Sequence, residues 1–174
     1  PKSAVFRTGD LVGLDTLGHV LANVYDGCPD DEERDLFLSP EWLKGMIEEG
    51  AVGDKAGHGF YKKTRDAAGK RVILVRNLKT GEYAPKGKVR FASTGSARNF
   101  DTAAEKIRVI LRGDDKAAQL GWSCTADTLI YAANRVPEIA DDIVNIDRGM
   151  KWGFAWDMGP FETWDAIGVA ESVA

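Results

Sequence analysis

The sequence predicts a mainly α-helical protein with one small β element. Segments such as Leu17–Val24 and Ile107–Leu111 carry apolar residues at helical spacing. β-Branched residues, in contrast, cluster in Arg71–Val75, between turn-forming residues. The chain lacks the repeated strand–helix alternation that a parallel sheet requires. We therefore expect packed helical units with a small β-hairpin insertion.

Composition narrows the class of protein. The 174 residues are 44% hydrophobic and 29% charged, which is typical of a folded globular protein. The sequence contains no apolar run long enough to span a membrane. The formal net charge of -4 disfavours nucleic acid as a partner. No signal peptide follows Pro1, so we expect a cytoplasmic protein. Cys28 and Cys124 form no metal-binding pattern and are expected to be buried free thiols.

An internal repeat is the most informative feature of the chain. The segment that begins at Phe6 recurs at Phe161, an offset of 161 minus 6, or 155 residues. Each copy is expected to be a short helix with a buried aromatic ring and a closing glycine in the left-handed conformation. We expect Asp15 to cap a new helix after the first copy. The identical residues are Phe6, Thr8, Asp10 and Gly13 in the first copy and Phe161, Thr163, Asp165 and Gly168 in the second.

Start and stop signals place the remaining elements. Ser39-Pro40 opens a helix that Gly50 closes, and Arg71–Val75 can pair with Glu82–Ala84 as a hairpin. Lys86–Asn99 lacks a period and is interpreted as a linker.

Two further helices are expected after this linker. Thr102–Glu105 has the pattern of a capping box, and a long helix follows from Asp114 until Pro137 ends it or kinks it near Arg135 and Val136. Beyond that proline, Ile139, Ile143 and Ile146 are expected to continue the apolar face.

Candidate sites each have a simpler structural interpretation. Gly53–Tyr61 has the glycines of a phosphate loop but not the spacing, so a tight turn that buries Phe60 and Tyr61 is favoured. Its glycines Gly57 and Gly59 are then structural. His19 and His58 lack neighbouring nucleophiles or metal ligands.

Two segments of the second half could contact a substrate. Asn134 ends the long helix, where its amide either steadies the turn before Pro137 or meets a substrate carbonyl. The aromatic segment Trp152–Phe161 is interpreted as core, with an acyl-binding wall as the alternative. We expect a structural role for Asn134 and no metal site.

Several motifs resemble L-3-hydroxyacyl-CoA dehydrogenases. Gly53–Tyr61 and the segment from Pro1 to Thr16 resemble the end of the C-terminal domain of that family, whereas Tyr131–Arg135 and Asp147–Gly168 resemble its beginning and middle. The run M-G-P-F-E, which includes Pro160, is fairly specific. The resemblance suggests the end of one domain copy in residues 1–64, a hairpin and linker in 65–100, and a second, truncated copy in 101–174.

The resemblance implies helical units like the C-terminal domain of 6-phosphogluconate dehydrogenase. It also implies an acyl-CoA substrate, self-association through the helical domains, and NAD as cofactor of the full-length enzyme, with a catalytic His-Glu pair in a separate Rossmann domain. The expected fragment binds no NAD and is inactive alone, and Asn134 is the second-copy equivalent of a family Asn that assists catalysis. The alternative is a free-standing helical module that binds acyl-CoA or dimerises.

Overall fold

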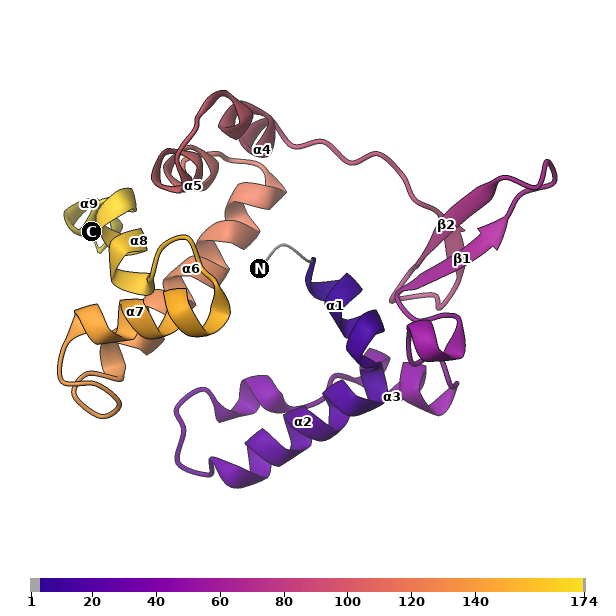
Figure 1. The fold of residues 1–174 in the computed structure, drawn as a ribbon, viewed down its shortest axis with the longest axis horizontal. Coiled ribbons are helices and arrows are strands. Elements are labelled where there is room, and N and C mark those ends of the chain that lie inside the picture. The colour runs from indigo at the N-terminus through magenta and orange to yellow at the C-terminus, as the bar shows by residue number, and fades with distance from the viewer. Residues whose placement is uncertain (1–3, 174) are drawn as a thin grey trace. The chain divides into compact units, whose positions relative to one another are not determined.

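The computed structural model describes residues 4–173 and divides into two compact units (Figure 1). The first unit extends to Gly87, and the second begins at Lys88. Both are built mainly from short helices, and the first also contains a small sheet. The predicted fold class, mainly α with a small β element, is therefore confirmed.

The first unit packs three α-helices around a small apolar core. The helices are α1 (Val5–Val12), α2 (Leu14–Gly27) and α3 (Glu41–Glu48), with short 3-10 turns η1 (Arg34–Phe37) and η2 (Asp54–Ala56) between the later elements. Leu14, Leu43, Met46, Ala51 and Phe60 form the core. The helix predicted after Ser39 is confirmed, with Pro40 as its N-cap. The N-cap predicted for α2 is wrong, because Gly13 takes that position and Asp15 lies inside the first turn.

A three-stranded antiparallel sheet completes the first unit. Its strands are β1 (Tyr61–Arg65), β2 (Arg71–Arg76) and β3 (Tyr83–Pro85), in the order β1-β2-β3. The predicted pairing of Arg71–Val75 with the segment around Ala84 is confirmed, since Val75 lies opposite Ala84. Strand β1 was not predicted, because three charged residues among its five residues obscure any apolar alternation.

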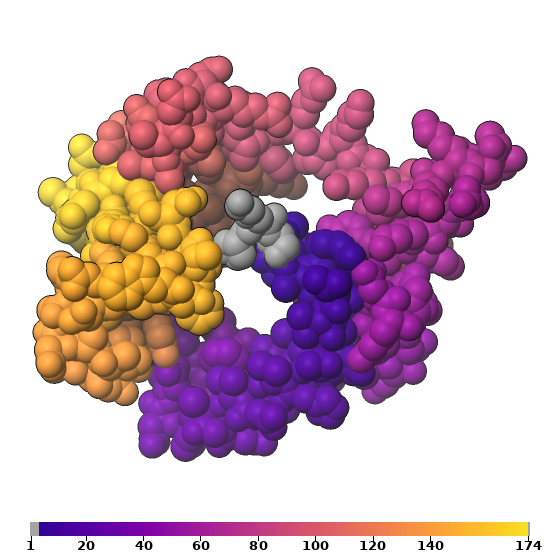
Figure 2. All heavy atoms as spheres, viewed as in Figure 1, coloured from indigo at the N-terminus to yellow at the C-terminus, as the bar shows by residue number. Residues whose placement is uncertain are grey.

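The second unit is entirely helical within the described residues 88–173. Helix α5 packs against α8 and α6, and the adjoining α7 and α8 appear as orange and yellow surfaces in Figure 2. The buried apolar residues are small or aliphatic: Ala97, Ala118, Leu129, Ala132, Ala166 and Ile167. The helices are α4 (Ala92–Ser96), η3 (Ala97–Asn99), α5 (Ala103–Leu111), α6 (Lys116–Asn134), α7 (Ile143–Phe154), α8 (Pro160–Ile167) and α9 (Val169–Ser172).

The capping box predicted in this unit is confirmed, but predictions for the linker, the two cysteines and the apolar face beyond Pro137 are wrong. Thr102 and Glu105 form the capping box of α5. The expected linker Lys86–Asn99 contains α4 and η3, held because Ser93 donates two hydrogen bonds to Asp115. Both cysteines are exposed, since one directly follows α2 and the other lies on an open face of α6. Ile139 lies outside any helix and is 72% exposed, and Ile143 is 47% exposed, so the apolar face does not continue through them.

The two repeat copies have the same secondary structure. Helix α8 has the bounds of α1 shifted by 155 residues, and each helix ends at a glycine with a positive φ. Gly13 (φ 107°, ψ 127°) and Gly168 (φ 95°, ψ 107°) have positive φ but lie outside the left-handed helical region that was predicted, and a second helix starts directly after each glycine. Phe6 is 47% exposed, so its predicted burial is wrong. Its ring contacts Phe60 only edge-on, with 4.7 Å between ring centroids, whereas Phe161 is partly buried.

Candidate functional site

A buried carboxylate fixes the glycine-rich turn to the first helix. Asp10 lies near the end of α1 and is 1% exposed. Its two oxygens accept hydrogen bonds from the backbone N–H groups of Phe60 (2.8 Å) and Tyr61 (2.9 Å). A buried charge needs such partners, and hydrogen bonds to a charged acceptor are stronger than neutral ones. The turn Gly53–Tyr61 is therefore positioned by a residue about 50 positions earlier in the chain.

Two glycines allow this close approach. A Cβ on Gly59 would lie 2.2 Å from Oδ1 of Asp10, and one on Gly53 would lie 2.3 Å from the Asp10 carbonyl oxygen. Gly57, by contrast, has open space around it and a left-handed conformation, φ 78°. Gly59 and Gly53 are needed for space, and Gly57 for its backbone conformation.

Two ion pairs surround the Asp10 contact. Arg7 donates two hydrogen bonds to Asp54, at 2.8 and 2.5 Å, and Lys55 donates to Asp15 at 2.7 Å. The Arg7 guanidinium lowers the pKa of Asp54, and the Lys55 ammonium lowers the pKa of Asp15. The N–H groups of Phe60 and Tyr61 are used by Asp10, and two carboxylates flank the turn. This arrangement suits a structural corner and not a phosphate cradle.

The second repeat copy lacks this burial at the equivalent aspartate. Asp165 is exposed, although it occupies the position that Asp10 has in the first copy. A different carboxylate, Asp147 of α7, is buried there and accepts from the N–H groups of Phe161 (2.8 Å) and Glu162 (3.0 Å). A Cβ on Gly159 would lie 2.2 Å from Asp147. Asp147 was not among the site residues predicted from the sequence, and its only signal was its place in the family-like run from Asp147 to Gly168.

An apolar groove of about 410 Å³ lies in the second unit, among α5, α6, the 155–158 loop and α8. Ala155 ends α7 in the left-handed conformation (φ 54°), an uncommon one for a residue with a side chain. This turn brings the residues that follow to the groove. The side chains that give the groove its character are Ile107, Cys124, Thr128, Leu129, Trp156 and Met158. The predicted aromatic segment thus contributes Trp156 and Met158, but Trp152 is 78% exposed and does not line the groove.

Other predicted candidates lie apart from this groove. Asn134 is exposed at the last position of α6, next to Arg135, which pairs with Glu138 at 3.1 Å. His19 is exposed on α2, and Nδ1 of the partly buried His58 lies 3.1 Å from the carbonyl oxygen of Ala56. Within residues 4–173, no cluster of His, Cys, Asp or Glu is suited to a metal ion.

Comparison with known proteins identifies the first unit. Residues 1–63 match the model of the 3-hydroxyacyl-CoA dehydrogenase C-terminal domain. These residues belong to that domain family. The match contains α1, the Asp10 contact and the glycine turn through Gly59. The 3-hydroxyacyl-CoA dehydrogenase resemblance proposed from the motifs is therefore confirmed.

Curated relatives extend the similarity over the second unit. A Bacillus subtilis protein named "Probable 3-hydroxyacyl-CoA dehydrogenase" is 44% identical over 172 residues, which is 99% of this chain and 21% of the relative. A Deinococcus radiodurans protein of the same name is 50% identical over 65 residues, 37% of this chain and 18% of the relative. The fatty acid oxidation complex subunit alpha of Acinetobacter baumannii is 28% identical over 168 residues, 95% of this chain and 20% of that protein.

The chain spans about a fifth of the length of these three relatives. No solved structure matches it. Among the helices within residues 4–173, none has the length and apolar character to cross a membrane.

Proposed function

We propose that this chain is the helical, substrate-side part of an NAD-dependent 3-hydroxyacyl-CoA dehydrogenase of fatty-acid β-oxidation. The observation that carries the proposal is the match of residues 1–63 to the C-terminal domain of that enzyme family. The similarity of nearly the whole chain to the Bacillus subtilis relative supports including the second unit. In this proposal residues 1–64 end one domain copy, residues 101–174 belong to a second copy, and residues 65–100 connect them.

The hydride chemistry is assigned to another part of the enzyme. NAD is usually held by a glycine loop between a parallel strand and a helix, where free N–H groups face the diphosphate. Here the glycine turn directs its N–H groups at Asp10, and β1, β2 and β3 are antiparallel. These residues do not fit NAD. We therefore propose that the isolated chain is inactive, and that NAD and the catalytic acid–base pair are supplied by the rest of the enzyme.

The groove in the second unit is our candidate for the acyl chain. Its lining is mainly apolar, with Ile107, Leu129, Trp156 and Met158 exposing hydrocarbon, sulfur and ring surface. Thr128 is not available as a strong donor there, because its hydroxyl donates to the Cys124 carbonyl oxygen at 2.7 Å. An apolar groove with few free polar groups suits an alkyl chain. Asn134 lies outside the groove lining, which favours a structural role for its amide.

Self-association is the second part of the proposal. Apolar side chains on single helices are widely exposed, among them Val5 and Leu11 of α1 and Leu120 and Ile130 of α6. Contiguous exposed apolar surface marks interaction sites, and these residues are our candidates for such surface. We propose that these faces are covered by other helical domains in the assembled enzyme.

Binding of acyl-CoA esters of increasing length tests the groove. Calorimetric titration of the chain should show affinity that rises from acetyl- to decanoyl-CoA, by at most about 0.8 kcal/mol for each buried methylene. Cys124→Phe should fill the groove and remove this length dependence. Leu120→Phe is the matched control on the same helix, because Leu120 is 67% exposed and does not line the groove. Equal affinity for all lengths, or equal behaviour of the two variants, would reject the groove as an acyl site.

A further inference from the structure

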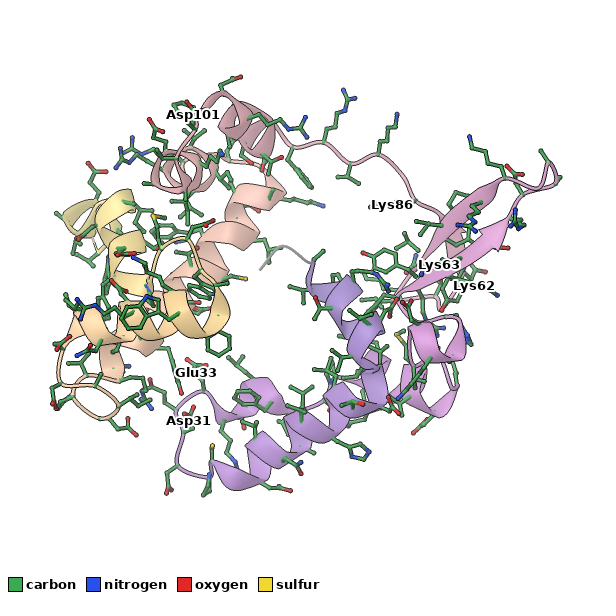
Figure 3. All side chains as sticks on the ribbon, in the orientation of Figure 1. Asp31, Glu33, Lys62, Lys63, Lys86 and Asp101 are labelled. Atoms are coloured by element: carbon green, nitrogen blue, oxygen red, sulfur yellow. The ribbon has the colours of Figure 1, made fainter. Side chains whose placement is uncertain are left out.

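Positive charge is concentrated in the sheet and the segment after it. Residues 61–90 contain ten Lys and Arg but only two Asp and Glu, whereas the whole chain has 23 and 27. The sheet is therefore strongly basic in an otherwise acidic protein. Figure 3 labels Lys62, Lys63 and Lys86, three of these cations, at the sheet.

Strand register gathers four of these cations on one face. Lys63 lies opposite Ile73, and Arg65 lies opposite Arg71. The backbone N–H of Lys86 donates to the carbonyl oxygen of Ile73 at 3.3 Å, which places Lys86 beside Ile73 on the other side. Alternate residues of a strand share a face, and directly opposed residues share it too. Lys63, Arg65, Arg71 and Lys86 thus surround Ile73, and we call these four residues the basic face.

The charges of the basic face are poorly compensated within the protein. Lys63 has one acidic neighbour, Asp54, at 3.7 Å, and the Arg65 side chain donates to the Gly69 carbonyl oxygen. Within residues 4–173, the side chains of Arg71 and Lys86 make no hydrogen bond or ion pair. Like charges directly opposed across two strands destabilise a sheet. The Arg65–Arg71 pair therefore carries a cost that a bound anion would offset.

The chemistry around these cations favours a phosphate-bearing ligand with an apolar part. Ile73 is 49% exposed at the centre of the basic face. A hollow of about 640 Å³ is lined by Lys63, Arg65, Arg71 and Ile73, together with Thr64 and Val72 of the opposite face. Guanidinium groups bind phosphate through two parallel hydrogen bonds. A long polyanion is disfavoured, because the strands are only five and six residues long and the rest of the chain is acidic.

We propose that the basic face binds the nucleotide end of coenzyme A. The 3′-phosphate and the diphosphate contact Arg65, Arg71, Lys63 and Lys86, and the adenine ring covers Ile73. This inference rests on the proposed function, which makes an acyl-CoA ester the substrate. It assigns a role to the hairpin, most of which lies beyond Lys63, where the match to the helical domain family ends.

Titration with ligands that lack the acyl chain tests the proposal separately from the groove. At low salt, the 174-residue chain should bind coenzyme A and adenosine 3′,5′-bisphosphate, and should bind dephospho-coenzyme A about tenfold or more weakly, because one charge-assisted contact is lost. Arg65→Gln/Arg71→Gln should weaken coenzyme A binding by about tenfold or more. Lys62→Gln is the matched control, because Lys62 neighbours Lys63 on the opposite face of β1.

Stability measurements separate ligand binding from folding. The double variant removes a like-charge pair, so its melting temperature should equal or exceed that of the wild type. Lys63→Gln, which breaks no cross-strand charge pair, should also weaken binding. The proposal is overturned if coenzyme A does not bind, or if Lys62→Gln weakens binding as much as Arg65→Gln/Arg71→Gln. It is also overturned if anionic vesicles or an oligonucleotide bind the basic face more tightly than coenzyme A.

Discussion

Two aspartates at equivalent repeat positions have different surroundings. Asp10 is buried and accepts two backbone hydrogen bonds from the glycine turn, whereas Asp165 is exposed. The repeat in the sequence predicts the equivalence but not this difference. Burial of Asp10 depends on Phe60 and Tyr61, which lie about 50 residues away and have no counterpart within the 174 residues for the second copy.

Replacing each aspartate by asparagine should therefore give unequal results. In Asp10→Asn the amide NH₂ faces a backbone N–H, so one buried donor loses its acceptor. The free energy of unfolding should fall by about 1–3 kcal/mol. Asp165→Asn should change it by less than about 0.5 kcal/mol, as is usual at exposed sites. Urea unfolding of both variants measures these values, and equal losses would show that the Asp10 contact contributes little.

The exposure of the Phe6 side chain could not be predicted from the sequence. An aromatic residue in a repeated helix is normally buried, yet this ring is 47% exposed and makes a T-shaped contact with Phe60. A single chain does not reveal which face of a short helix lies against a neighbour. The glycines are more predictable, because Gly13 and Gly168 both have the positive φ that their place after the repeated helices suggested.

At the scale of elements, the glycine turn depends on space next to α1. Gly59→Ala would place a Cβ 2.2 Å from Asp10 Oδ1, so the Asp10 contact must open. We expect a loss of about 1–3 kcal/mol in the free energy of unfolding. Gly45→Ala, in α3 with nothing within 4 Å of its Cβ, should instead stabilise by about 0.5–1 kcal/mol. Thermal melts of the two alanine variants distinguish these signs, and a stabilised Gly59→Ala would contradict the described packing.

The start of α6 should respond to acid. Asp115 accepts from the backbone N–H of Ser93 and from those of Ala117 and Ala118, and these hydrogen bonds lower its pKa, with the Ser93 bond the largest cause. The pKa of Asp115 is therefore lower in the folded than in the unfolded protein. The stabilisation that the Asp115 charge gives is complete above about pH 4 and is lost as pH falls through the folded pKa.

Asp115→Asn should consequently lower the melting temperature at pH 7 but have a smaller effect at pH 3. Thermal melts of the wild type and the variant at both pH values test this. The measured quantity is the difference in melting temperature between the two proteins at each pH. If the difference in melting temperature is the same at both pH values, or is larger at pH 3, the Asp115 charge does not stabilise the start of α6.

Most helices could be predicted from local signals, whereas some elements could not. The capping box of Thr102 and Glu105 and the stop before Pro137 are encoded within a few residues, and both helix ends are found there. Strand β1 and helix α4 depend on tertiary partners. Strand β1 pairs with β2 despite its charged sequence, and α4 is held because Ser93 bonds to Asp115, 22 residues later.

At the scale of the whole molecule, the candidate sites were less predictable than the helices. The groove combines Ile107, Cys124 and Met158 from three segments of the second unit. Each residue alone resembles an ordinary core or surface position, so only the aromatic segment gave a signal. The family motifs, in contrast, indicate the enzyme class directly from the amino-acid sequence, because they are contiguous runs such as Gly53–Tyr61.

The proposed function assigns the chain to the substrate side of the dehydrogenase and not to its nucleotide-binding side. Parallel calorimetric titrations of the purified chain with NAD and with a 3-hydroxyacyl-CoA ester test it most directly. We predict binding of the ester, no micromolar binding of NAD, and no turnover when both ligands are present. Micromolar NAD binding, failure of the ester to bind, or oxidation of the ester by the chain alone would contradict this assignment.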